Sequence, residues 1–231
     1  AMDPQQRHAL MNAVQALADA GIDPDRTVAK IGIIASAGEN VYFQQVLKHV
    51  DGKQLPDGFQ MALHHDKDYL ASKIAYRLGL TGPAYSVQTA CSSSLVALHL
   101  GAQAVRFGDC DIVVVTGVLA DPTLTEGYRY RPNHIFSRDG TCRPFDVMAS
   151  GTIGASGVCS LVLKSAPVAM QDGSRIHALL LGSAINNDGH AKMGYAAPSA
   201  EGQADAIKRA LLQAGLTAAD IGFVEAHGTG T

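Results

Sequence analysis

The sequence lacks the features that mark nucleic-acid-binding, membrane and secreted proteins. It has little net charge, −3 at neutral pH, and its 18 basic residues are scattered along the chain, so nothing indicates binding to nucleic acid. It has no apolar run long enough to span a bilayer, which argues against a membrane protein. No secretory signal is recognisable, and we therefore expect a cytoplasmic protein with reduced thiols.

Cysteine is scarce as well. The four cysteines, Cys91, Cys110, Cys142 and Cys159, lie far apart, without a C-x-x-C pair or a tight histidine cluster. This spacing argues against a zinc site, so we expect no bound metal.

The pattern that remains is typical of a folded α/β domain. Hydrophobic residues make up 47% of the 231 residues, enough for a sizeable core. Short apolar, β-branched runs predict strands at 28–36, 83–88, 111–118, 158–164, 176–186 and 221–226. Helical patterns separate most of these runs. They lie between Pro4 and Gly21, at about 39–50 and 67–78, from near Cys91, and at about 199–214. The alternation predicts a layered α/β architecture with a largely parallel sheet, and 119–156 is predicted to be a functional loop region.

Cys91 stands between a predicted strand and a predicted helix. The positive end of a helix stabilises a thiolate, and its backbone N–H groups can hold the oxyanion that forms when a cysteine is acylated. An inert, buried cysteine fits the local pattern equally well, so both interpretations stay open here. Two apolar helix faces are also predicted, Leu10, Val14, Leu17 and Ala18 in the first helix and Leu95, Leu98, Ala102 and Val105 in the helix after Cys91.

The remaining cysteines and the histidines give one further candidate. Cys110 and Cys159 adjoin or lie within apolar strands and are predicted to be core residues, whereas Cys142 lies in a loop. His227 follows the last predicted strand on a glycine-rich turn, the end of a strand where ligand-binding groups gather in open α/β sheets. A surface-loop histidine is the alternative, and the other eight histidines have no comparable setting.

Several segments taken in order resemble a β-ketoacyl synthase, and more closely the ketosynthase domain of a modular polyketide synthase. They are "TACSSSLVALHLGAQAVRFGDCDIVVVTGV", "FSRDGTCRPFD", "GSAINNDG", "APSAEGQ" and "VEAHGTGT", with "DPQQR" near the start. The resemblance implies a thiolase-like fold, a layered α–β–α–β–α sandwich made of two α/β halves. On this basis 1–165 is expected to form the N-terminal half without its first strand, and 166–231 the start of an incomplete C-terminal half.

The same resemblance implies a function and roles for particular residues. The family condenses an acyl thioester with a malonyl-type extender held on an acyl carrier protein. Cys91 matches the acyl-accepting nucleophile, and His227 matches a histidine that assists decarboxylation and stabilises the enolate oxygen. Thr229 and Thr231 match positions that hold the phosphopantetheine arm of the carrier, while no cofactor is expected to be bound by the chain itself. A homodimer, formed through the strand before the nucleophile, is also expected.

Departures from the family pattern leave alternatives open. Gln88 stands where the family usually has Asp, and "GASG" (154–157) replaces a glutamate-containing turn. The second family histidine and its accompanying lysine have no counterpart, so we expect acyl attachment but no condensation by this chain alone. The alternatives are a non-elongating module that binds an acyl chain or carrier protein, and a cysteine hydrolase, which would need a base and a carboxylate near Cys91.

Overall fold

The computed structural model describes residues 2–190, 192–195 and 197–231. The chain divides into two compact units, one made of 1–165 together with 225–231, and the other of 166–224.

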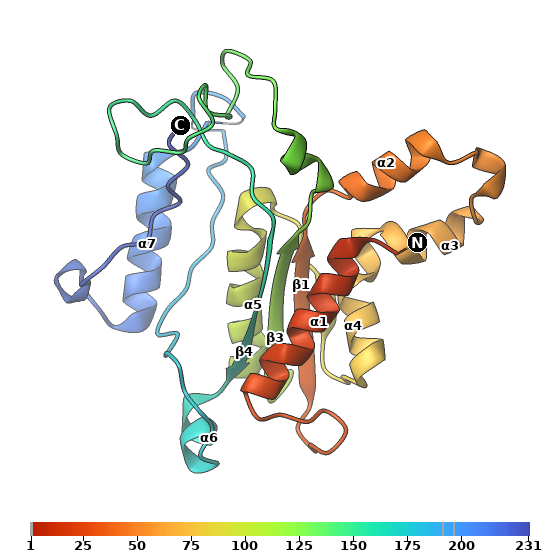
Figure 1. Ribbon diagram of the computed structural model, residues 1–231. Helices are drawn as coiled ribbons and strands as arrows, with labels where there is room; N and C mark the ends of the chain where they lie inside the picture. Colours follow the sequence, from red (N-terminus) through yellow and green to blue (C-terminus); the bar gives the residue numbers. More distant parts are fainter. Residues whose placement is uncertain (1, 191, 196) are drawn as a thin grey trace. The chain divides into compact units, whose positions relative to one another are not determined.

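The first unit is built on a four-stranded sheet (Figure 1). Its strands are β1 (Ile31–Ala37), β2 (Ala84–Ser86), β3 (Ile112–Leu119) and β4 (Gly157–Lys164), in the order β2-β1-β3-β4. β2 and β3 run parallel to β1, and β4 runs antiparallel to β3. The predicted largely parallel α/β sheet is therefore confirmed for this unit.

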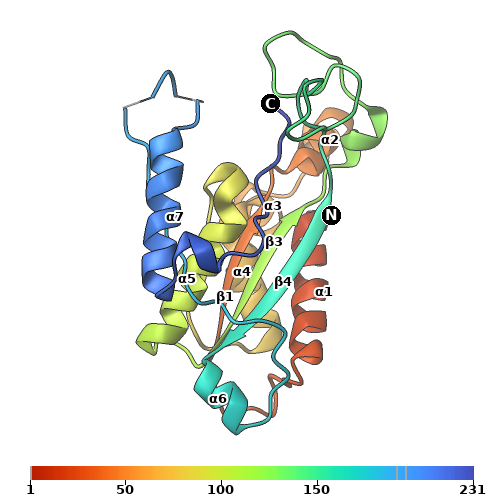
Figure 2. The same ribbon diagram turned by 90° about the vertical axis from the view of Figure 1, so that its left-hand side faces the viewer.

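Helices cover both faces of this sheet (Figures 1 and 2). α1 (Pro4–Asp19) and α4 (Leu70–Leu78) pack on one face against residues such as Ile33 and Val114, and α5 (Ser93–Phe107) packs on the other against Val113 and Val115. Successive strand residues point to opposite faces, so the strands that lie under both layers need apolar residues at nearly every position. The continuous runs at 31–35 and 112–115 satisfy this requirement.

The buried faces of α1 and α5 differ from the predicted ones. α1 begins as predicted, with the Asp3 carboxylate accepting a hydrogen bond from the Gln5 backbone N–H at 2.8 Å. Its buried face, however, consists of Gln5, Gln6, Ala9, Ala13 and Leu17, whereas Val14 and Ala18 are exposed. α5 likewise buries Ser93, Ala97, Gly101 and Ala104, while Leu95 is 71% exposed and Leu98, Ala102 and Val105 lie beside the buried stripe. Small residues occupy these buried faces because they let a helix approach its neighbours closely.

Two further α-helices of the first unit, α2 and α3, lie between β1 and α4 along the chain. α2 (Val41–His49) matches the helix predicted at 39–50, and α4 follows a 3₁₀ turn at Lys67–Tyr69 within the helix predicted at 67–78. α3 (Gly58–His65) was not predicted; the Asp57 side chain caps it by accepting from the backbone N–H groups of Phe59 and Gln60. A 3₁₀ turn at Pro122–Glu126 begins the loop region after β3.

The second unit contains α6 (Ala166–Gln171), the predicted helix α7 (Ala200–Ala214) and a 3₁₀ turn at Ala218–Asp220. The predicted strands at 176–186 and 221–226 were wrong: within the described residues neither segment forms a strand. The backbone near residue 183 instead bonds to side chains of α7, with the Ser183 N–H donating to Gln213 Oε1 at 2.6 Å and Arg209 donating to the Ile185 carbonyl at 3.1 Å. An apolar run becomes a strand only where another strand satisfies its backbone groups.

Candidate functional site

Cys91 lies in a tight turn between β2 and α5. The turn is a 3₁₀ helix at Ala90–Ser92, and the Cys91 side chain is exposed. Ala90 has a φ of +54°, a left-handed conformation that residues other than glycine rarely adopt. Strained backbone of this kind persists where the surrounding structure holds it in place, and it is common at functional sites. The alternative of a buried Cys91 is wrong for this structure.

Serine and threonine groups hold the turn in this conformation. The Thr89 backbone N–H donates to Ser93 Oγ at 2.9 Å, and the Ser93 hydroxyl donates to the Ala90 carbonyl at 2.7 Å. The Ser92 hydroxyl donates to the Thr89 carbonyl at 2.9 Å. Two of the three serines after Cys91 therefore lock the backbone around the thiol, a role that the local sequence pattern did not indicate.

Close packing on the sheet fixes the start of α5. A Cβ on Gly117 of β3 would come within 2.2 Å of Ser94 Oγ, so any larger residue there would force Ser94 to move. Ser94 Oγ is also 3.4 Å from Ser36 Oγ of β1. Because the first turn rests on two strands, Cys91 is held directly before a 15-residue helix, whose first backbone N–H groups can stabilise an oxyanion.

The other cysteines have different environments. Cys110 is 3% exposed, as predicted, and burial raises the pKa of its thiol. The prediction that Cys159 is a core residue was wrong, because it lies on the exposed side of the edge strand β4. Cys142 is half-buried, and its thiol lies 3.5 Å from the Gly228 carbonyl oxygen and 3.4 Å from that of Thr229. No local pattern indicated these contacts, since 86 residues separate Cys142 from Gly228.

The segment 227–231 carries the remaining predicted site residues. His227 is exposed, and the hydroxyl oxygens of Thr229 and Thr231 are 2.8 Å apart. Gly228 and Gly230 have φ values of +61° and +66°, so the turn uses glycine where other residues would be strained. The two threonine side chains are therefore in direct contact.

A hollow of about 570 Å³ adjoins this segment. It is lined on one side by Gly228, Thr229, Gly230 and Thr231, and on the other by Pro144, Phe145, Asp146, Val147 and Ala149. Thr229 and Thr231 therefore border a space large enough for part of a small-molecule ligand.

The Cys91 turn and the segment 227–231 belong to the same compact unit. The chain end lies beyond the carboxyl ends of β1 and β3, and the amino-terminal end of α5 faces the same way (Figures 1 and 2). Among the described residues, no hydrogen bond joins the Cys91 thiol to His227. The structure thus places the Cys91 turn and the histidine segment at the same end of the sheet.

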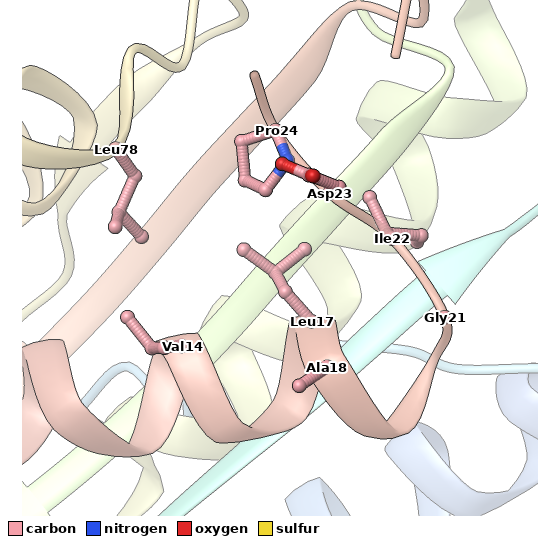
Figure 3. A pocket seen from close by; sticks show the side chains of 8 residues that line it. All are labelled: Val14, Leu17, Ala18, Gly21, Ile22, Asp23, Pro24 and Leu78. Carbon is pink, nitrogen blue, oxygen red and sulfur yellow. The ribbon is translucent and has the colours of Figure 1, made fainter. Parts of the chain in front are cut away.

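A second hollow, of about 370 Å³, lies between α1, the loop after it and the end of α4 (Figure 3). Its lining residues are Val14, Leu17, Ala18, Gly21, Ile22, Asp23, Pro24 and Leu78. Among the described residues, this mostly apolar lining contains neither cysteine nor histidine. The Asp23 carboxylate of that lining forms an ion pair with Arg26 at 3.2 Å. We therefore place the candidate site at Cys91 and 227–231.

Two kinds of feature are absent from the part of the chain that the structure describes. It contains no group of three or more cysteine, histidine or acidic side chains arranged to bind a metal ion. None of its helices has both the length and the apolar character needed to cross a bilayer.

Comparison with known families identifies the class of this chain. The model of the β-ketoacyl synthase N-terminal domain matches residues 1–169, and that of the β-ketoacyl synthase C-terminal domain matches residues 177–231. The chain therefore belongs to the β-ketoacyl synthase family, as its motifs predicted.

Individual relatives narrow the resemblance to polyketide synthases. The chain is 44% identical over its whole length to a phenolphthiocerol/phthiocerol polyketide synthase of Mycobacterium tuberculosis, and 40% identical to the erythronolide synthase EryA2 of Saccharopolyspora erythraea. It spans 16% and 6% of those proteins, respectively. The chain is thus similar to one segment of much longer proteins.

Solved structures confirm the fold. Ketosynthase twelve of the bacillaene polyketide synthase from Bacillus amyloliquefaciens superposes with a TM-score of 0.92 at 35% identity, and the ketosynthase from module 1 of the bacillaene synthase from the same species gives 0.86 at 36%. The chain is covered completely but spans only 40% and 39% of those chains. Its fold is the thiolase-like α/β fold of ketosynthases, of which it contains part.

Proposed function

We propose that this chain carries the acyl-accepting part of a polyketide ketosynthase, a condensing acyltransferase. The single observation that supports this most is the exposed Cys91 thiol, held in a strained turn at the positive end of α5. In this proposal 1–165 forms the N-terminal half of the domain and 166–231 the start of the C-terminal half.

The first chemical step is acyl transfer. The Cys91 thiolate attacks the carbonyl carbon of an acyl thioester, and the tetrahedral oxyanion is stabilised at the start of α5. The carbon–sulfur bond to the carrier then breaks, and the carrier leaves as a thiolate that takes up a proton. The product is an acyl group in thioester linkage to Cys91.

The second step, decarboxylative condensation, is one that we assign to the ketosynthase domain as a whole and do not expect from this chain alone. A malonyl-type extender loses CO2, and the electron pair of the broken bond forms an enolate whose carbon attacks the Cys91 thioester, releasing the thiolate. We assign His227 the role of donating a hydrogen bond to the enolate oxygen. Thr229 and Thr231, which border the hollow beside 144–149, are the residues that we expect to bind the phosphopantetheine arm of an acyl carrier protein.

Selective acylation of Cys91 tests the proposal. The 231-residue chain is incubated with a short acyl-pantetheine thioester, and intact mass and peptide mapping locate the acyl group. We expect one added acyl group on Cys91 and none in Cys91→Ala. Cys159 is a built-in control, because it is also exposed but lies on a strand instead of at a helix start. Equal acylation of Cys91 and Cys159 would contradict the proposal.

A further inference from the structure

The motif "FSRDGTCRPFD" has no role in the two chemical steps, yet it contacts the segment that carries His227. The Cys142 thiol has one proton and faces two acceptors, the carbonyl oxygens of Gly228 at 3.5 Å and Thr229 at 3.4 Å. A thiol is a weak donor, but sulfur–oxygen distances of this size are normal hydrogen-bond contacts for it. Cys142 therefore holds the backbone immediately after His227.

A second contact holds the next residue of the same segment. The Gly151 N–H donates to the Gly230 carbonyl oxygen at 2.9 Å. A Cβ on Gly230 would lie 3.3 Å from the Arg143 nitrogen, and a Cβ on Gly151 would lie 2.5 Å from the Ile135 carbonyl oxygen. Backbone thus packs directly on backbone, and the carbonyls of three successive residues, 228 to 230, are held by the loop 135–152.

That loop is itself fixed by a buried serine. Ser137 is 0% exposed, and its hydroxyl oxygen lies 2.9 Å from Asp139 Oδ1 and accepts from the Thr141 N–H at 3.1 Å. The Ser137 carbonyl accepts from the Tyr128 hydroxyl at 2.5 Å. Hydrogen bonds from Ser137 and Arg143 hold the pKa of Asp139 below its usual range. Both neighbours of Cys142 are therefore anchored.

We propose that Cys142 is a positioning residue for His227 and Thr229, acting through the backbone of Gly228 and Thr229. This inference rests on the proposed function in one respect, namely that His227 is a catalytic residue. The His227 side chain is exposed, so the direction in which its ring points depends on how the following backbone is held. Removing the thiol hydrogen bond frees that backbone while leaving the sheet intact.

The test compares Cys142→Ala, which removes the donor, with Cys142→Ser, which keeps one, in the full 231-residue chain. Cys159→Ala is the matched control, because Cys159 lies on β4 and pairs there with β3. Hydrogen exchange of the Gly151 amide is followed by NMR, since its N–H bonds to Gly230, together with the ring signals of His227. We expect roughly two- to fivefold faster Gly151 exchange in Cys142→Ala, because a thiol hydrogen bond is weaker than an ordinary one.

The His227 ring signals should shift in Cys142→Ala, and Cys142→Ser should restore both the signals and most of the exchange protection. Amides of β1 and β3 should be unaffected in all variants. The proposal is overturned if Gly151 exchange and the His227 signals are the same in Cys142→Ala as in the unmodified chain, or if Cys142→Ser behaves like Cys142→Ala. Neither readout requires acylation of Cys91, so failure of the proposed function and failure of this inference are distinguishable.

Discussion

Gln5 shows at the scale of one residue why a polar side chain is buried in this fold. It is 1% exposed, and its carboxamide nitrogen lies 3.3 Å from the carbonyl oxygens of both Gly38 and Glu39, just after β1. Its carboxamide oxygen accepts from the Ala120 N–H at 3.3 Å, just after β3. One amide group thus joins the start of α1 to the loops that leave two strands, which accounts for part of the "DPQQR" motif.

Replacing Gln5 by Glu is expected to lower the free energy of unfolding by about 1–3 kcal/mol. A carboxylate cannot donate to Gly38 and Glu39, and it would face the Asp3 carboxylate, which lies 3.2 Å from the present amide nitrogen. Urea unfolding measures the change. Gln15→Glu, at an exposed position of the same helix, is the control and should change the free energy by no more than about 0.5 kcal/mol. Equal effects at both positions would contradict this explanation.

At the scale of an element, α5 depends on its stripe of small residues. A Cβ on Gly101 would lie 2.8 Å from Val115 Cγ2 and 3.2 Å from Val113 Cγ1, so the helix lies almost directly on β3. Leu95, the large apolar residue nearest the Cys91 turn, is 71% exposed and contributes little to this contact. The face of α5 that packs on β3 is therefore the one with the least apolar area per residue.

Two substitutions in α5 distinguish this face from the one that the apolar pattern indicated. Gly101→Val is expected to cost about 1–3 kcal/mol, because branched methyl groups overpack a contact made by stiff valines. Leu95→Ala should stay within about 0.5 kcal/mol, since an exposed side chain loses little on truncation. Denaturant unfolding of both variants measures the difference. A larger loss for Leu95→Ala than for Gly101→Val would show that the helix packs through its leucines.

The edge strand β2 is the element through which we expect the whole molecule to associate. The Ile33 N–H donates to the Pro83 carbonyl, and the Val87 N–H donates to the Ala35 carbonyl. Residues 83 and 87 therefore face β1, and by the alternation of a parallel ladder the N–H of Ala84 faces the free edge. An unpaired edge of this kind can pair with the same strand of a second copy.

Ala84→Pro is expected to convert the predicted homodimer to a monomer while leaving the sheet intact. Proline removes an N–H that faces away from β1, and it is tolerated on edge strands for that reason. Light scattering after size-exclusion chromatography measures the mass, and Ala84→Val, which keeps the N–H, should remain dimeric. If Ala84→Pro is still a dimer, or the unmodified chain is a monomer, β2 is not the dimer strand.

Local patterns predicted the elements of the first unit well. The strands β1, β3 and β4 and the helices α1 and α5 all form close to where periodicity and caps placed them, as does α7 in the second unit, because these signals act over a few residues. The position of Cys91 at a helix start was predicted in the same way. Its family was indicated by motifs, and comparison confirmed it; the roles of Cys91, His227, Thr229 and Thr231 remain predictions.

The sequence by itself thus determined most of the elements, the family and the candidate nucleophile. Only the tertiary structure decided which face of α5 is buried, that Cys159 is exposed, and that 176–186 bonds to side chains of α7 instead of pairing as a strand. It also brought Cys142 to Gly228, 86 residues away. The reason is physical: propensity and capping depend on near neighbours, whereas burial and long-range hydrogen bonds depend on which surfaces the folded chain brings together.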